Sequence, residues 1–237
     1  NKITKIETSN GAISSIFTSD KKLNIGQDDI VISSLPIVNL IRMLGYSTEL
    51  KYRGVMIFYL DCMKKRILPK NIHWLYYDSK KVYFSRITEA KQMNVNVPST
   101  NKTLITIEVP YSVGDKLDRK DTGEITKEII EQVEKVGLVA KTDVVNATMI
   151  KEKFVYPIQY QGYSKELARV NSIIGDVKQL YSLGAGGEFN YADTQIIFEK
   201  AFDFARSLSK EDVISVRGIK ERAVSKFNKV IDINGIN

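Results

Sequence analysis

Three glycines in four positions, Gly184, Gly186 and Gly187, follow a short apolar segment and precede an amphipathic one. Glycine lets a ligand approach the backbone because no Cβ stands in the way. The next segment opens a predicted helix, whose first turn has unpaired N–H groups and a dipole that favours negative charge. That first turn comprises Ala192, Asp193, Thr194 and Gln195. The pattern indicates a site for a pyrophosphate or an electron-rich ring, or a tight strand-to-helix connection that binds nothing.

Two residue types restrict the other chemistry that this chain can do. Cys62 is the only cysteine, which excludes an intramolecular disulfide and indicates a reducing compartment, so we expect a cytoplasmic protein. We interpret it as a structural thiol because no base beside it could activate a nucleophile. His73 is the only histidine, which excludes a multi-histidine metal site within one chain. We therefore expect no metal, and we identify no catalytic residue.

Composition is that of an ordinary globular chain with room for one large or two small domains. The chain has 237 residues, of which 43% are hydrophobic, and no apolar run is long enough to span a bilayer. Its net charge of +7 could attract phosphorylated small molecules, acidic polymers or nucleic acid. No basic stripe is interleaved with aromatic residues and no nucleic-acid motif is present, which favours a solvated surface and no nucleic-acid partner.

Hydrophobic periodicity predicts alternating strands and helices. The predicted strands are 2–8, 12–18, 30–34, 52–60, 72–77, 82–87, 104–109, 143–150 and 154–156, with a hairpin at Asn10-Gly11 and a strand end at Pro110. The predicted helices are 36–44, 122–136 with Thr122 as its cap, 164–174, and one after the glycine turn. The last helix is expected to bury one face, formed by Ile197, Ala201, Phe204, Ala205 and Leu208.

The order of these elements predicts an α/β (α+β) protein with a split domain. Residues 1–45 and 158–208 carry short buried strands and helices, whereas 46–157 is mostly antiparallel strand. The economical interpretation is one domain with a sheet-rich insertion. Residues 209–237 are predicted to form a basic helical tail with a disordered end.

Four stretches, taken in order, resemble the C-terminal part of the flavin-dependent amine oxidase superfamily, which includes protoporphyrinogen oxidase and UDP-galactopyranose mutase. They are the hairpin with 29–36, then 84–89 (Phe-Ser-Arg-Ile-Thr-Glu), 155–158 (Val-Tyr-Pro-Ile), and 184–193 (Gly-Ala-Gly-Gly-Glu-Phe-Asn-Tyr-Ala-Asp). The family's N-terminal Rossmann segment is absent, so the chain resembles a C-terminal portion that would need this segment as a partner. Relatives often have arginine where this chain has Ala185.

The resemblance implies an FAD-dependent oxidoreductase or mutase, with residues 1–45 and 158–208 in the FAD-binding domain and 46–157 binding a small-molecule substrate. Its cofactor-binding residues would be Gly184, Gly186, Gly187, Ala192, Asp193, Thr194 and Gln195. The helix N-terminus would face the flavin, where it would stabilise the negative charge of the reduced form. A fragment of this kind is expected to be inactive alone.

The resemblance also implies substrate-binding residues, namely Arg86, Tyr111, Tyr156 and Tyr160. Arg86 would bind a carboxylate or phosphate, or else form a surface ion pair with Glu89 or another acid. The tyrosines would contact substrate or pack in the core. Arg86 and the basic charge favour a sugar-nucleotide or carbohydrate-related substrate, as in lipopolysaccharide biosynthesis. Two alternatives stay open, a non-catalytic binding module and a nucleic-acid binder, the latter requiring steep salt dependence.

Overall fold

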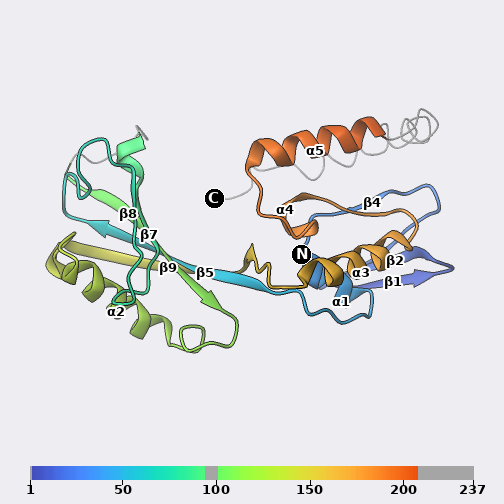
Figure 1. Cartoon of the computed structure of the whole chain (residues 1–237), viewed down its shortest axis with the longest axis horizontal. Helices are drawn as coiled ribbons and strands as arrows, with labels where there is room; N and C mark the ends of the chain where they lie inside the picture. The colour runs from blue at the N-terminus through green and yellow to red at the C-terminus, as the bar shows by residue number, and fades with distance from the viewer. Residues whose placement is uncertain (1, 94–100, 208–237) are drawn as a thin grey trace. The chain divides into compact units, whose positions relative to one another are not determined.

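The computed structural model describes residues 2–93 and 101–207, which form two compact units (Figure 1). Within the described residues, the first unit comprises 2–49 together with 161–207, and the second comprises 50–93 together with 101–160. Each contains both helices and strands, so the protein is of the mixed α/β kind. The predicted tail at 209–237 lies outside the described residues.

The described residues of the first unit form two small sheets and four helices. Its antiparallel sheet has the order β1-β2-β3, and its parallel sheet has the order β10-β4. The strands are β1 (Ile3–Ser9), β2 (Ala12–Thr18), β3 (Lys22–Asn24), β4 (Val31–Ser33) and β10 (Leu180–Ser182). The helices are α1 (Ile37–Met43), α3 (Tyr163–Gly175), α4 (Gly184–Gly187) and α5 (Thr194–Ser207).

The hairpin between β1 and β2 forms where the sequence predicts it. Asn10 and Gly11 have φ angles of +53° and +74°. A two-residue turn with both φ angles positive matches the twist of the strands that it joins, and asparagine followed by glycine tolerates it best. Residue types alone therefore specify this turn.

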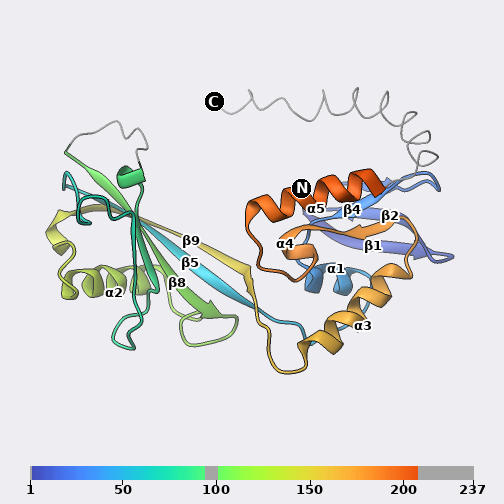
Figure 2. The same cartoon turned by 45° about the horizontal axis from the view of Figure 1, so that its top comes forward.

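The second unit is a five-stranded sheet with α2 (Thr122–Lys135) packed along one face, as Figure 2 shows. The strand order is β6-β7-β8-β5-β9, and every pairing is antiparallel. The strands are β5 (Tyr52–Cys62), β6 (Trp74–Tyr76), β7 (Arg86–Glu89), β8 (Thr103–Ser112) and β9 (Val144–Pro157). Two short 3-10 turns, Ala90–Met93 and Lys141–Asp143, follow β7 and precede β9.

The core of this unit lies between the sheet and α2. Alternate residues of β5 and β8, such as Phe58 and Ile107, are buried together with Ile125, Ile129 and Val133 of the helix. Because successive side chains of a strand point to opposite faces, the intervening residues lie on the face opposite α2. We call this the second face of the sheet.

Several predicted element bounds were wrong for identifiable reasons. Pro110 does not end its strand; it pairs with Val55 inside β8. Proline has no N–H to donate, and at Pro110 an N–H would point towards β7. The pairing of β7 with β8 already ends at Glu108, so no hydrogen bond between strands is lost. Asp121, rather than Thr122, caps α2, with its carboxylate accepting from the N–H groups of Gly123 and Glu124 at 2.8 and 3.2 Å.

Two further differences involve strands. The predicted strands 143–150 and 154–156 are one strand, β9, which continues across a register shift opposite Arg53 and Val55. The predicted strand 82–87 begins later, at Arg86. The polar residues Glu152 and Lys153 predict a break between two strands when the local sequence is considered alone. In the structure the strand continues through them, because it pairs with the long β5 on either side.

Candidate functional site

The two parallel strands of the first unit, β4 and β10, bring together the two turns that follow them. Leu180, Tyr181 and Ser182 of β10 pair with Val31, Ile32 and Ser33 of β4. At their carboxyl ends, β4 leads through Pro36 into α1 and β10 leads into the glycine turn. In open α/β sheets, ligands bind at the carboxyl ends of parallel strands. The candidate cofactor residues therefore lie at the end of this sheet where such ligands bind.

Close packing accounts for two of the glycines. A Cβ on Gly187 would lie 2.9 Å from the Ser182 Oγ and 3.1 Å from the Ser33 carbonyl oxygen. A Cβ on Gly186 would lie 3.3 Å from the Ser34 carbonyl oxygen. Both residues belong to α4, a four-residue helix where the sequence predicted only a turn. These Cα atoms thus face the backbone at the β4–α1 junction.

The other side of the turn is open. Gly184 has a φ of +83°, which favours glycine, and a Cβ there would meet no atom of the described chain within 4 Å. Ala185 beside it is exposed. The backbone that a ligand could approach is therefore at Gly184 and Ala185.

Helix α5 begins at Thr194, two residues after the start of the first turn that the sequence predicts at Ala192. The Asp193 carbonyl accepts from the N–H groups of Ile196 and Ile197 at 3.0 and 3.2 Å. Ala192 and Gln195 flank this start. Lys200 reaches back to the Glu188 carboxylate at 3.0 Å, which links the helix to the end of the glycine turn. The four predicted residues thus do surround a helix N-terminus.

The buried face predicted for α5 was wrong within the described residues. Ile197 and Phe204 are half-buried, and the Phe204 ring lies 4.9 Å from that of Tyr181. The other apolar positions are open, with Phe198 and Phe202 61% and 62% exposed. Leu208 lies outside the described residues. Amphipathic spacing predicts a helix correctly but does not reveal how much of the apolar side is covered.

Arg86 lies on the second face of the second unit's sheet, opposite Glu108 in the β7–β8 register. Its Nε donates to the Glu108 Oε1 at 2.8 Å, and its Nη2 donates to the same oxygen. These hydrogen bonds raise the pKa of Arg86. With Trp74, Thr88, Met93 and Thr106, the pair lines a cavity of about 310 Å3. The guanidinium is therefore already paired with an acid.

Glu89, the acid considered as a partner of Arg86, has a different role. Its side chain is completely buried. Its carboxylate accepts from the N–H of Leu68 and the hydroxyl of Thr103, both at 2.7 Å, and from the N–H of Ile67 at 3.1 Å. Glu89 thus joins the loop after β5 to the sheet.

The three candidate tyrosines do not form one cluster. Tyr111 is 1% exposed in the core beneath α2, with the Lys151 ammonium 4.9 Å from its ring centre. Tyr156 lies opposite Arg53 in the β5–β9 register and lines a cavity with it. Tyr160 is half-buried at the end of this unit. Only Tyr156 therefore shares a face of the sheet with Arg86.

The structure adds Arg53 and Glu108, which the sequence interpretation missed. Both are charged residues within largely apolar strands, so strict alternation along β5 and β8 places them on the second face. That alternation is visible in the sequence and could have identified them. Their pairing partners could not be identified, because a β-register depends on distant segments.

Burial also decides the state of the only thiol. Cys62 is buried, and this burial raises its pKa to about 12. The thiolate, which is the nucleophilic form, is therefore scarce at neutral pH. Within residues 2–93 and 101–207, no group of three or more histidine, cysteine or acidic side chains could hold a metal ion. In the same residues, no helix has the length and apolar character needed to cross a membrane.

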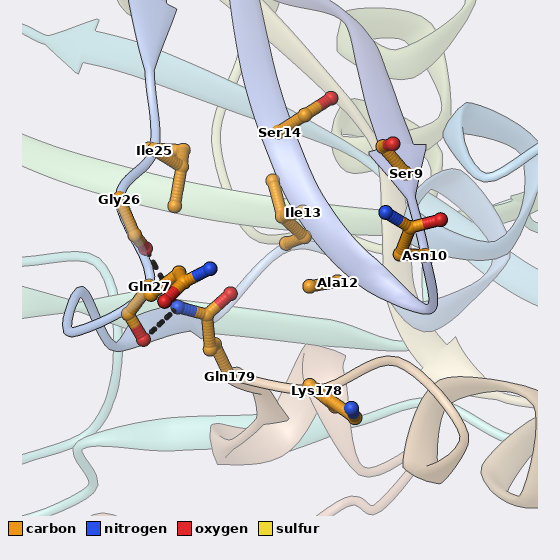
Figure 3. Close-up of a pocket in the computed structure, with 10 residues that line it drawn as sticks. All are labelled: Ser9, Asn10, Ala12, Ile13, Ser14, Ile25, Gly26, Gln27, Lys178 and Gln179. Atoms are coloured by element: carbon orange, nitrogen blue, oxygen red, sulfur yellow. Dashed lines mark hydrogen bonds between the residues drawn. The ribbon is translucent and has the colours of Figure 1, made fainter.

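A cavity of about 460 Å3 in the first unit lies at the opposite, amino end of the parallel sheet (Figure 3). Gln179 donates from its amide nitrogen to the carbonyl oxygens of Gly26 and Gln27 at 2.6 and 2.5 Å. Its Oε1 is buried without a hydrogen-bond partner in the described chain. The hairpin residues Ser9 and Asn10 complete the wall. Gln179 thus ties the segment before β10 to the segment before β4.

Comparison with known proteins identifies the fold of this chain. Neither a protein-family model nor a curated protein matches the sequence. The structure is similar to that of reduced UDP-galactopyranose mutase, with a TM-score of 0.69 and 20% identity. It is also similar to a protein from Exiguobacterium sp. 255-15 assigned as a protoporphyrinogen oxidase, with a TM-score of 0.61 and 12% identity. Each match covers 85% of this chain and 46% of the other.

These likenesses define the class of fold. The chain has the fold that an oxidoreductase and a mutase share over this region, and it spans about half the length of either structure. The sequence resemblance to UDP-galactopyranose mutase and protoporphyrinogen oxidase is thereby confirmed as a likeness of fold. At these identities the likeness extends no further than the fold.

Proposed function

We propose that this chain is part of an FAD-dependent oxidoreductase or mutase, whose first unit contributes to the cofactor site and whose second unit binds a carbohydrate-related substrate. The observation that carries the proposal is the junction of β4, β10 and the glycine turn. Two parallel strands end side by side there, and the backbone at Gly184 and Ala185 is open. Phosphate groups bind at such strand ends beside exposed backbone.

The chain's own residues would hold and orient the cofactor, which supplies the redox chemistry when bound. Gly184 and Ala185 would face the pyrophosphate. The N–H groups at the start of α5, from Ala192 to Gln195, would face a part of the cofactor that gains negative charge. Gly186 and Gly187 support the site indirectly, because they allow α4 to pack closely against Ser33 and Ser34.

The remainder of the cofactor site would come from a dinucleotide-binding segment outside this sequence. The two-stranded parallel sheet supports this part of the proposal, because parallel strands are normally buried on both faces within larger sheets. Ile32 of β4 is 56% exposed, and Tyr181 beside it is also exposed. Further strands and helices of such a segment would cover these side chains.

The proposal is tested by flavin retention. Visible absorbance is measured after FAD is added and the protein is desalted, for this chain and for a longer polypeptide that adds a dinucleotide-binding segment before residue 1. We expect the longer polypeptide to retain flavin. Ala185→Asp should weaken retention at least about tenfold, because a carboxylate would repel the pyrophosphate. Ser172→Asp adds the same negative charge at an exposed position of α3 and should leave flavin retention unchanged. Equal retention by both variants would contradict the proposed site at Gly184 and Ala185.

A further inference from the structure

The loop that joins β5 to β6 combines positive charge with exposed apolar side chains. We call residues 63–73 the basic loop. Met63 and Ile72, near its two ends, are 49% and 37% exposed. Four cationic side chains lie between them, and all four are exposed: Lys64, Lys65, Arg66 and Lys70. The basic loop therefore presents a run of cations between two apolar side chains.

Buried polar groups fix the middle of the basic loop to the sheet. The Glu89 carboxylate, which is completely buried, accepts from the N–H groups of Ile67 and Leu68 at 3.1 and 2.7 Å. The Gln92 amide nitrogen donates to the Leu68 carbonyl oxygen at 3.2 Å. The Leu68 side chain is itself buried. The loop is thus anchored at Leu68, and its cations on either side of this anchor stay at the surface.

Most of the charge of the basic loop is not neutralised by acids. Lys64 forms an ion pair with Asp143 at 3.1 Å. Among residues 2–93 and 101–207, no carboxylate forms an ion pair with the other three cations, which are Lys65, Arg66 and Lys70. Soluble surfaces usually mix charges of both signs. Three unpaired cations within six residues therefore suit an anionic partner.

The basic loop leads directly into the only tryptophan of the chain, Trp74. Trp74 is 46% exposed and is the first residue of β6, which is an edge strand of the sheet. It lies opposite Thr88, the neighbour in β7 of the anchoring Glu89. Tryptophan is enriched at the boundary between lipid headgroups and acyl chains. The cations and an exposed indole therefore occur together at this edge.

From this combination we infer that the basic loop binds the surface of an anionic lipid bilayer. Headgroup phosphates would attract Lys65, Arg66 and Lys70. The boundary beneath the headgroups would take up the apolar side chains of Met63 and Ile72. A soluble acidic polymer could neutralise the cations but would leave these apolar side chains in water, which favours lipid as the partner. The inference goes beyond the proposed function and does not depend on flavin or substrate.

Vesicle binding by the full chain tests the inference. Co-sedimentation is measured with vesicles of phosphatidylcholine alone and with vesicles that contain equal parts of phosphatidylcholine and phosphatidylglycerol. We expect binding to the anionic vesicles only, weakened by added salt because salt screens exposed charges. The fluorescence of Trp74 should shift to shorter wavelength on binding, because its indole enters a less polar layer. Since Trp74 is the only tryptophan, this signal reports on the basic loop and not on another basic segment.

A charge-matched pair of triple variants locates the binding surface. The loop variant combines Lys65→Gln, Arg66→Gln and Lys70→Gln. It should bind anionic vesicles on the order of a hundredfold more weakly, because each Lys or Arg near such a surface contributes about fivefold. The control variant removes three exposed cations elsewhere in the second unit, with Lys116→Gln, Lys127→Gln and Lys153→Gln. It should lose less than about threefold, because these residues lie outside the basic loop.

Four results would overturn the inference. Absence of binding to the anionic vesicles would exclude a lipid partner. Equal losses in the two triple variants would mean that net charge alone attracts the chain to the vesicles. Binding without a shift of the Trp74 fluorescence would place the contact on another part of the chain. Binding to soluble polyglutamate that is as tight as binding to vesicles, and equally sensitive to the loop variant, would identify an acidic polymer as the partner.

Discussion

The Glu108 carboxylate accepts two hydrogen bonds from the Arg86 guanidinium on the second face of the five-stranded sheet. The pair joins β7 to β8 directly across the register. The ion pair neutralises Arg86, the arginine that the sequence analysis selected. Arg53 lies on the same face and forms no ion pair with an acid among the described residues. The polarity of this face therefore follows from pairing between strands rather than from any single residue.

The buried carboxylate of Glu89 should be one of the most sensitive positions of the second unit. Glu89→Gln keeps the size of the side chain but removes its charge and replaces one accepting oxygen by a donor. The hydroxyl of Thr103 can accept from this donor, so the loss falls on the buried N–H groups of Ile67 and Leu68, which lose a charged acceptor. This should lower the free energy of unfolding by about 1–3 kcal/mol.

Denaturant unfolding checks this value, with Glu131→Gln on the exposed side of α2 as the control. The control should change the free energy of unfolding by less than about 0.5 kcal/mol. A loss for Glu89→Gln no larger than that of the control would mean that water satisfies the donors equally well.

Local sequence predicts much of this fold, because several elements are specified by neighbouring residues. Asn10-Gly11 determines its own turn, and the spacing of Ile125, Ile129 and Val133 determines α2. Pairing partners are different. Arg86 facing Glu108, and Arg53 between Ser112 and Tyr156, depend on strands that lie far apart in the chain.

The glycine turn shows a second limit of sequence interpretation. The residue types correctly indicate a close approach of backbone, but they do not reveal what approaches. For Gly186 and Gly187 it is the chain itself at the end of β4, and only Gly184 faces open space. A glycine needed for packing and a glycine needed for a ligand are identical in sequence.

This distinction predicts a stability effect at Gly187. In Gly187→Ala the new methyl group would lie 2.9 Å from the Ser182 Oγ and 3.1 Å from the Ser33 carbonyl. Overpacking of this kind should cost about 1–3 kcal/mol of unfolding free energy. Gly175→Ala, where a Cβ would meet nothing within 4 Å, should be neutral or slightly stabilising. Thermal unfolding of the two variants gives the comparison, and equal melting temperatures would show that α4 can shift without cost.

The carboxylate of Glu166 should make a pH-dependent contribution to the stability of the first unit. It accepts from Arg169 at 2.8 Å, from the Thr48 hydroxyl at 2.7 Å and from the Glu49 N–H at 3.0 Å. The hydrogen bond from Arg169, followed by those from Thr48 and Glu49, lowers the pKa of Glu166 from 4.5 to about 2. The folded state therefore holds this carboxylate ionised at pH values where the unfolded chain protonates it.

Because the folded pKa is the lower one, the unfolded state binds the extra proton as the pH falls. The stabilisation is thus fully present above about pH 4.5 and is lost progressively towards pH 2. Glu166→Gln should be less stable than the unmodified chain at pH 7, and the difference should shrink between pH 4.5 and pH 2. Urea unfolding across this range measures it, with Glu199→Gln on the exposed side of α5 as the control. A difference that stayed constant with pH would show that Glu166 acts through packing or neutral hydrogen bonds, because only an ionised partner of Arg169 makes the contribution titrate.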